Sequence, residues 1–572
     1  ASLPSRDDGS YTNIQNNFAI EWKITSDLFV RGNFGFTKQD SRTDKYLSRE
    51  HTSFDTDEYK GENSNMKGSY TYTTSYMLSY EGNLTVNYTK TFNKVHQLYA
   101  GLSGNLAEDK DESYSVTGRG FSSLNMKNLG MAGAYALGKP TSTEAHSRRL
   151  GLIFNVNYTY DRRYFADFSG KIEGSSKFGS NDRTAPFFSA GLGGSSSNAI
   201  NVLRFRFSYG TIGSQNFSSY QALTTYRYFG QENYKYWNGA YMLGMGNPDL
   251  SWQKTKQLNL GVETSLFNGL VRLNVDYYNK LTEDLLTDIN LPTAGGFSSY
   301  KANVGEVRNR GIELDANVFL IRNSESHIMW SVGGNLAHNV NKILKISNAL
   351  EFLNSELLDE AGPNPSFLYQ EGQSMNTIFV VRSLGIDPAT GSELFLNKDG
   401  ERVYTWDPKD KVPFGVNEPK VRGNLRTMFR WRDITLNATF SYRLGGHIYN
   451  QTLVGKVENT TTAAKRWGNL DKRALYDRWQ NEGDVTKFKN IKDFNTTNAS
   501  SRFVMKENAL SLNTLNVNYE FDTEWLKRHC RLDYLAIGFY AEDVFYLSTV
   551  KQERGLSYPF ARKFSVSLSA RF

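Results

Sequence analysis

The amino-acid sequence predicts an all-β fold, namely a transmembrane antiparallel β-barrel. Apolar and polar residues alternate with a period of two along many long segments, which is the pattern of a strand with two unlike faces. Charged residues stand in the middle of the polar face, and the apolar face ends in Tyr, Phe or Trp. Short and long connections also alternate along the chain. A water-filled lumen, an aromatic girdle and long loops on one side of a membrane explain these observations together.

Composition favours a barrel over a string of soluble domains. The chain has 572 residues, of which 14% are aromatic, including 34 Tyr and 36 Phe, whereas the mean hydropathy is only −0.54. The aromatic content excludes a disordered chain. No segment approaches the roughly 18 apolar residues of a membrane helix. Because only helices and closed barrels satisfy every backbone group in lipid, the sequence predicts a barrel.

The alternation defines each strand in order, and it is clearest in the segment KFSVSLSARF. There Phe564, Val566, Leu568 and Phe572 are expected to face lipid, and the serines between them the lumen. The predicted strands are longer than the usual five or six residues. We expect about 17 of them, at 11–24, 27–38, 75–92, 95–107, 148–160, 163–174, 184–195, 201–210, 252–267, 270–285, 307–321, 327–340, 420–432, 434–448, 503–521, 531–546 and 563–572.

The connections predict which side of the membrane each strand end faces. Short links are expected near 25, 93, 161, 198, 267, 322, 431 and 526, and long links at 40–73, 109–147, 211–251, 288–306, 344–419, 450–502 and 547–561. The short links belong in the periplasm and the long loops outside the cell. Single-chain bacterial barrels have even strand numbers. An odd count therefore means either one miscounted strand or a chain that begins in an external loop and lacks the first strands of the barrel.

Nucleic-acid binding and enzymatic activity are not predicted. The net charge is only +7, from 66 Lys and Arg against 59 Asp and Glu, and the basic residues are scattered. The single cysteine, Cys530, excludes an intrachain disulfide. No metal-binding, nucleophile or cofactor motif is found among the seven dispersed histidines and the rest of the chain. Asp387 to Glu401 is rich in Asp, Asn and Gly but lacks EF-hand spacing, so a pair of β-turns is favoured over a metal site.

Two groups of residues are candidates for contacts with a ligand or partner. Aromatic residues gather in a predicted external loop: Tyr226, Tyr228, Tyr234, Tyr236, Trp237 and Tyr241. They either stack on sugar rings or peptide side chains, or pack against neighbouring loops or a partner, and packing is favoured. Arginines occupy predicted lumen positions: Arg204, Arg206, Arg426 and Arg430. They either contact a plug or a polar substrate, or form structural charge pairs, and pairs are favoured because polar faces need partners.

Several motifs then resemble one family. The segment GNPDLSWQKTKQLNLGVETSLFNGLVRLNVDYYNKLTEDLL is similar to the SusC-like (SusC/RagA) branch of TonB-dependent outer-membrane transporters. Further similar motifs follow the family's order from about residue 160 to the end: FSGKIEGSSKFGSNDR, RFRFSYGTIGSQNF, NVGEVRNRGIEL, GIDPATGSELFLNKDG, YDRWQNEGDVT and LSYPFARKFSVSLSARF. The chain departs from the family pattern at Glu173, at APFFSAG (185–191) and at Asn481 to Gly483. These departures concern details of loops.

The resemblance implies an importer in the outer membrane of a Gram-negative cell. It implies uptake of oligosaccharides or oligopeptides with a SusD-like surface lipoprotein, driven by the TonB complex through a plug, without a cofactor. The family's barrel has about 22 strands, so residues 1–572 are expected to be the C-terminal portion of the barrel, and a plug-bearing N-terminal polypeptide of the same transporter is an expected partner. The alternative is a passive pore or a structural barrel. The choice between glycan and peptide stays open at this point.

Overall fold

The computed structural model describes most of the chain. It omits residues 1–4, 123–127, 137–139, 197–201, 216, 235–236, 291–298, 304, 324, 347–350, 352–353, 356, 359–360, 460–469, 522, 552–561 and 572. Two predicted residues, Tyr236 and Phe572, and the short link near 198 therefore lie outside the described residues. Within the described part, no helix is long and apolar enough to cross a membrane.

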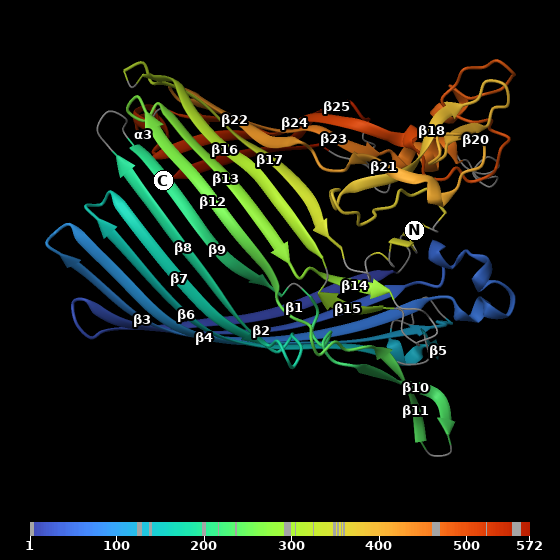
Figure 1. Cartoon of the computed structure of the whole chain (residues 1–572), viewed down its shortest axis with the longest axis horizontal. Coiled ribbons are helices and arrows are strands. Elements are labelled where there is room, and N and C mark those ends of the chain that lie inside the picture. The colour runs from blue at the N-terminus through green and yellow to red at the C-terminus, as the bar shows by residue number, and fades with distance from the viewer. Residues whose placement is uncertain are drawn as a thin grey trace. The chain divides into compact units, whose positions relative to one another are not determined.

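Strands make up most of the fold (Figure 1). They are β1 (Arg6–Lys23), β2 (Leu28–Leu47), β3 (Ser69–Phe92), β4 (His96–Arg119), β5 (Ala134–Tyr135), β6 (Thr141–Tyr160), β7 (Tyr164–Ser175), β8 (Thr184–Ser196), β9 (Val202–Ser214), β10 (Thr225–Tyr234), β11 (Trp237–Gly244), β12 (Gln253–Leu266), β13 (Val271–Glu283), β14 (Leu286–Asn290), β15 (Ser299–Asn303), β16 (Glu306–Asn323), β17 (Ile328–Lys345), β18 (Thr377–Ile386), β19 (Glu393–Leu396), β20 (Arg402–Val403), β21 (Lys411–Val416), β22 (Val421–Trp431), β23 (Ile434–Tyr449), β24 (Val504–Glu520), β25 (Tyr534–Ser548) and β26 (Lys563–Arg571).

Helical segments are short and lie in the connections. They are the 3-10 helices η1 (Thr52–Phe54), η2 (Asp57–Tyr59), η3 (Gly61–Met66), η4 (Leu129–Met131), η7 (Pro408–Asp410), η9 (Lys472–Leu475) and η10 (Ser501–Phe503), the π-helix η8 (Leu453–Glu458) and the α-helix α3 (Thr523–Cys530). The α-helix occupies the link that was predicted as a short turn near 526.

The prediction of a large antiparallel sheet is confirmed. Eighteen of the described strands belong to one sheet. One of these is the two-residue β5, so seventeen longer strands remain, and each coincides with one of the predicted segments. The described short links near 93, 161 and 267 are tight turns. In two of these, two successive residues have positive φ, Asn93 with Lys94 and Asp161 with Arg162, as in the turns that suit the twist of a hairpin.

Unit 1 comprises Ala1–Leu192, Gly210–Lys254 and Leu286–Asn303. It contains the series β1–β2–β3–β4–β6–β7, in which each strand pairs antiparallel with the next. The register aligns apolar residues of successive strands on one face: Val30, Val86, Leu102 and Phe154 are consecutive partners. The last three of them are exposed. Such an exposed apolar row is the face that a membrane barrel turns toward lipid.

Unit 2 comprises Gly193–Tyr209, Thr255–Leu285 and Val304–Phe572. It contains the series β13–β16–β17–β22–β23–β24–β25–β26, again antiparallel throughout. Here the register aligns a polar row, in which consecutive partners are Asn274, Asp315, Asn335, Asn424 and Ser441. The neighbouring positions form the opposite, apolar face, because side chains alternate along a strand. The two faces of the predicted strands are therefore present in this unit.

Five strands of unit 1 extend at least five residues beyond their predicted bounds of 11–24, 27–38, 75–92, 95–107 and 148–160. The strand β4, for example, continues to Arg119, and β6 begins at Thr141. The added part is held by paired hydroxyl groups across β3 and β4 at 2.9 Å: Thr71 with Thr117, Thr73 with Ser115 and Ser75 with Ser113. These hydroxyl groups make one face of the added part polar, and on the other face Tyr46 and Tyr70 pack against Phe121 of the following loop. The apolar alternation is therefore lost although the backbone ladder continues. The loops 40–73 and 109–147 are correspondingly shorter than predicted.

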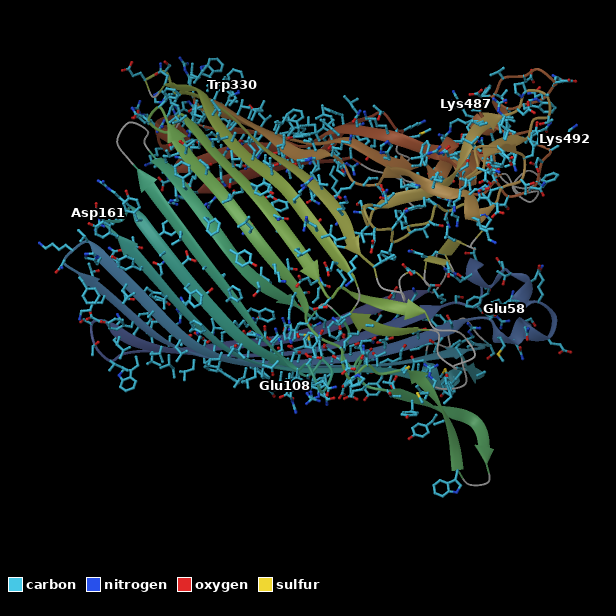
Figure 2. The ribbon with its side chains drawn as sticks, in the orientation of Figure 1. Glu58, Glu108, Asp161, Trp330, Lys487 and Lys492 are labelled. Atoms are coloured by element: carbon cyan, nitrogen blue, oxygen red, sulfur yellow. The ribbon has the colours of Figure 1, made fainter. Side chains whose placement is uncertain are left out.

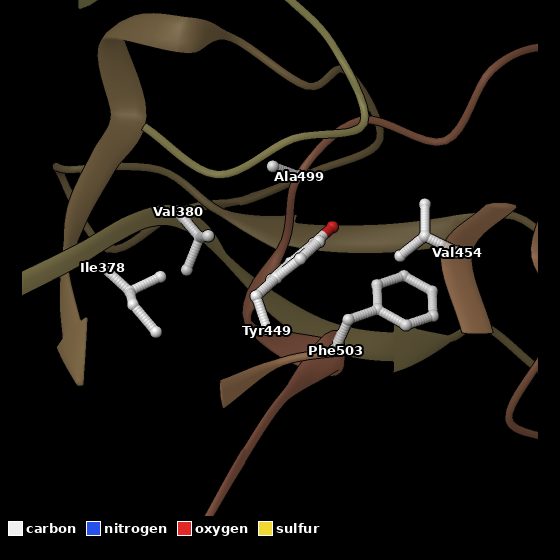
Figure 3. Packing of buried hydrophobic residues seen from close by; sticks show 6 residues of the cluster. All are labelled: Ile378, Val380, Tyr449, Val454, Ala499 and Phe503. Atoms are coloured by element: carbon white, nitrogen blue, oxygen red, sulfur yellow. The ribbon is translucent and has the colours of Figure 1, made fainter. Parts of the chain in front are cut away.

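Three smaller sheets form within the predicted long links. Two are the two-stranded sheets β10–β11 and β14–β15, and the third has the order β20–β19–β18–β21. In unit 2, strand β18 of this third sheet, the end of β23 and the segments η8 and η10 contribute residues to a separate hydrophobic core (Figure 3). We call residues 366–416 and 449–503 the loop module. Its core residues are Ile378, Val380, Tyr449, Val454, Ala499 and Phe503.

Candidate functional site

The four arginines predicted for the polar face are ion-paired. Each lies beside a carboxylate of another strand, at N–O distances of 3.0–3.8 Å: Arg204 with Glu263, Arg206 with Asp276, Arg426 with Asp315 and Arg430 with Glu520. Their side chains are 41–55% exposed, so each pair contributes little to stability, about 0–1 kcal/mol. The pairs neutralise the polar face of unit 2 rather than leaving it strongly basic.

A fifth arginine on this face was not singled out from the sequence. Arg443 lies 3.4 Å from the carboxylate of Glu507 and donates a hydrogen bond of 3.2 Å to the hydroxyl of Tyr546. Its position among the polar members of the predicted strand 434–448 was the available signal. The partner could not be read from the sequence, because Glu507 is 64 residues away.

A cavity of about 500 Å³ lies on the polar face of unit 2. Residues of β13, β16, β17, β22 and β23 line it. Among them are three side-chain amides, those of Asn274, Asn335 and Asn424. Five charged side chains also line it: Asp276, Glu313, Asp315, Arg422 and Arg443. The cavity therefore offers hydrogen-bond donors and acceptors together with charged groups of both signs, which suits a polar ligand better than an apolar one.

The predicted aromatic cluster lies on the hairpin β10–β11 of unit 1. Tyr226 and Tyr228 stand on one face of it, 60% and 66% exposed, and Trp237 near its end is 77% exposed. Tyr241 lies opposite Arg227, whose guanidinium donates a 3.4 Å hydrogen bond to the Tyr241 hydroxyl. The backbone of Tyr234 pairs with that of Trp237. The hairpin thus presents several described aromatic side chains to solvent.

Within the loop module, one arginine joins two buried carboxylates. Arg502 lies 2.7 Å from Glu393 and 2.6 Å from Glu458, and the three side chains are at most 11% exposed. Burial disfavours the guanidinium charge, but the two carboxylates outweigh it and raise the pKa of Arg502. A second buried arginine, Arg478, donates to four backbone carbonyl groups, among them those of Ala474 and Lys489. These contacts connect β19, η8, η9 and η10.

Pairs of the resembling motifs contact one another. In the loop module, Trp479 belongs to YDRWQNEGDVT and Pro388 to GIDPATGSELFLNKDG. The indole nitrogen of Trp479 donates a hydrogen bond of 2.8 Å to the carbonyl oxygen of Pro388. In unit 1, the backbone of Gly179 in FSGKIEGSSKFGSNDR bonds to that of Leu250 in GNPDLSW at 2.9 Å. There Phe178 stacks on Trp252 with ring centroids 4.2 Å apart. These motif residues hold loops to each other.

The segment from Asp387 to Glu401 forms turns and strand β19. Asp387 accepts hydrogen bonds from the hydroxyl groups of Tyr404 and Thr390 and from the backbone amide of Ala389. The Tyr404 hydroxyl is the main cause that lowers the pKa of the Asp387 carboxyl. Over the part of the chain that the structure describes, no group of three or more His, Cys, Asp or Glu side chains is arranged to hold a metal ion.

An alternating antiparallel sheet with a neutralised polar face and an exposed apolar face defines the wall of a transmembrane β-barrel. Residues 2–519 match the family described as TonB dependent receptor-like, beta-barrel. The chain therefore belongs to this family, whose barrels lie in the outer membrane. The match also begins well before the resembling motifs, which start near residue 160.

Curated relatives support the SusC-like assignment. TonB-dependent receptor P39 of Formosa agariphila is 24% identical over 95% of this chain and 55% of its own length. TonB-dependent receptor P3 of the same organism is 24% identical over 83% of this chain and 50% of its own length. TonB-dependent receptor SusC of Bacteroides thetaiotaomicron is 22% identical over 65% of this chain and 37% of its own length. The chain spans about half the length of P39 and P3.

Solved structures agree on the fold. The RagAB peptide importer in its closed-closed state superposes with a TM-score of 0.83 at 20% sequence identity, covering 99% of this chain and 62% of that chain. Its open-open state also superposes with a TM-score of 0.83 at 20% sequence identity, covering 100% of this chain and 62% of that chain. At this identity the similarity concerns the fold alone.

Proposed function

We propose that this chain forms part of the barrel wall of a SusC-like importer, which moves oligosaccharides or oligopeptides across the outer membrane. Family membership over residues 2–519 is the observation that carries the proposal. The paired charges of the polar face support it, because a solute pathway with neutralised walls does not trap charged solutes by bulk attraction. The relative named SusC and the fold shared with the RagAB peptide importer point to the same branch.

In this proposal a SusD-like lipoprotein covers the external end of the barrel. Long ordered loops usually serve a function, and the loop module has its own hydrophobic core and buried charge network. Figure 2 places Lys487 and Lys492 at the far end of this module, where a partner has access to them. The exposed aromatic side chains of Tyr226, Tyr228 and Trp237 supply a second contact surface for the lipoprotein or for ligand.

Energised transport further requires the TonB complex and a plug. We assign residues 1–572 to the C-terminal portion of the barrel domain and the plug to a plug-bearing polypeptide of the same transporter. The support is the coverage of the relatives, of which this chain spans 55% and 50%. A passive pore or structural barrel is the second candidate, because a barrel wall by itself does not require an energy source.

Uptake and copurification test the proposal. The transporter containing this chain is affinity-tagged in its native outer membrane, and its partners are identified by mass spectrometry. We expect a surface lipoprotein and a plug-bearing polypeptide in the purified complex. Cells should lose uptake of an oligosaccharide or oligopeptide nutrient both when this chain is deleted and when TonB is deleted. Uptake that persists unchanged without TonB would favour the passive pore, and a complex without any lipoprotein would contradict the proposed partner.

A further inference from the structure

Two charged side chains of the unit-2 cavity differ from the other charges on its face. Glu313 and Arg422 both line the cavity of about 500 Å³. Among the residues that the structure describes, neither side chain makes a hydrogen bond or an ion pair. By contrast, Arg206, Arg426 and Arg443 on the same face all have carboxylate partners. The cavity therefore holds one carboxylate and one guanidinium group that the sheet itself leaves unmatched.

The strand register fixes the spacing of these two charges. Glu313 is the register partner of Ala337, and Ala337 is the register partner of Arg422. Neighbouring strands lie about 4.8 Å apart, so the backbones of Glu313 and Arg422 are separated by about 10 Å. The methyl group of Ala337 fills little of the space between them. A ligand lying across β16, β17 and β22 would thus meet a negative group at one end and a positive group at the other.

We propose that this cavity binds a short peptide as a dipolar ligand, with Glu313 receiving its cationic group and Arg422 its carboxylate. The inference rests on the proposed import function and assigns its substrate class. Guanidinium and carboxylate groups form strong, often bidentate hydrogen bonds. The amides of Asn274, Asn335 and Asn424 line the same cavity, and an amide both donates and accepts hydrogen bonds, as a peptide bond requires. A neutral glycan would leave both charges without a counter-charge.

Calorimetric titration of the purified complete transporter tests this assignment. The probes are trialanine with free termini, N-acetyl-trialanine, trialanine amide, the doubly blocked peptide and maltotriose. We expect trialanine to bind at least tenfold more tightly than the doubly blocked peptide or maltotriose. Glu313→Gln should abolish the preference for a free amino group and keep that for a free carboxylate. Arg422→Gln should do the reverse.

The control variant is Glu542→Gln, which removes a carboxylate of the same unit that pairs with Lys563 at 3.9 Å. It should leave both preferences unchanged. Equal binding of free and blocked trialanine, or one variant abolishing both preferences, would overturn the inference. So would a loss of thermal stability in both variants without any change in peptide preference, because the charges would then serve another part of the transporter. Tight binding of maltotriose alone would overturn this inference and leave the importer proposal intact, whereas wild-type cells without any uptake would contradict the importer proposal instead.

Discussion

At the scale of single residues, Arg502 determines how the loop module holds its charges. Its guanidinium contacts Glu393 and Glu458, whose side chains are 6% and 0% exposed. One carboxylate oxygen of Glu458 has no hydrogen-bond partner among the described residues. Arg502 therefore forms ion pairs with two buried carboxylates, Glu393 and Glu458, which lie 65 residues apart in the sequence. Such a group stabilises the module only while it is complete.

Replacing Arg502 by Gln should lower the free energy of local unfolding of the loop module by about 3–5 kcal/mol, because two buried carboxylates would lose the arginine with which they form ion pairs. Hydrogen exchange with mass spectrometry measures this, and peptides from β19 and η8 should exchange faster. The matched control is Arg528→Gln, since the pair of Arg528 with Glu524 is 75% and 83% exposed. The control should change stability by less than about 0.5 kcal/mol. Equal exchange in both variants would argue against a structural role for Arg502.

At the scale of elements, the connection after β7 depends on a close backbone approach. The amide of Gly179 bonds to the carbonyl of Leu250, and a Cβ at Gly179 would overlap the carbonyl oxygen of Pro248. A glycine is required here because two backbones meet, not because of its φ angle. The approach also brings Phe178 against Trp252. The hydrophobic cluster of unit 1 at this position therefore depends on a residue without a side chain.

Gly179→Ala should consequently release the segment 176–183 from the segment 247–252. Limited proteolysis of membrane-inserted protein should show cleavage in 176–183 that the wild type resists. Gly104→Ala provides the control, because a Cβ at Gly104 meets no atom within 4 Å. If both variants resisted protease like the wild type, the clash would be relieved by backbone movement and the close approach would not matter.

The strand β26 allows a test of which face meets lipid. Its register places Val566 opposite Phe539 and Ser567 opposite Gly538. Val566→Arg should lower the yield of assembled barrel, since arginine on the lipid face near the membrane midplane costs about 2–4 kcal/mol. Ser567→Arg should be tolerated, because it adds a charge to the polar face. Heat-modifiable migration on electrophoresis measures the assembled fraction, and equal losses in both variants would contradict the assignment of the two faces.

At the scale of the whole molecule, the sides of the membrane follow from loop length. In unit 2 the long links carry the loop module, whereas β16 and β17 are joined by a short turn. Val485 in the loop module is 86% exposed, and Glu325 in the short turn is exposed as well. A reagent in solution can therefore reach both positions in the isolated protein. In intact cells, a difference in their labelling would come from the outer membrane.

Single cysteines at these two positions should react differently in intact cells. In a Cys530→Ser background, Val485→Cys should be labelled by a membrane-impermeant maleimide. Glu325→Cys should react only after the outer membrane is permeabilised, because short turns lie in the periplasm. The labelled fraction is read by mass shift. Labelling of Glu325→Cys in intact cells, with Val485→Cys protected, would invert the orientation of the sheet.

Much of the fold was predictable because strand periodicity is local. The alternation of Phe564, Val566 and Leu568 with serines gives the two faces of β26 directly. The extensions of β4 and β6 were not predictable in this way. Their stability comes from hydroxyl groups paired across strands, such as Thr73 with Ser115, which leave no apolar pattern in the sequence.

For the candidate sites too, local sequence determined some features and strand assembly determined the others. The sequence by itself determined which residue types occupy the polar face, including Arg206 and Arg426. The reason is that successive side chains of a strand point to opposite faces of the sheet. Only the tertiary structure decided that these arginines are paired, whereas Glu313 and Arg422 are not. The reason is that an ion pair depends on strand register and spacing across segments distant in sequence, and register arises only when the strands assemble.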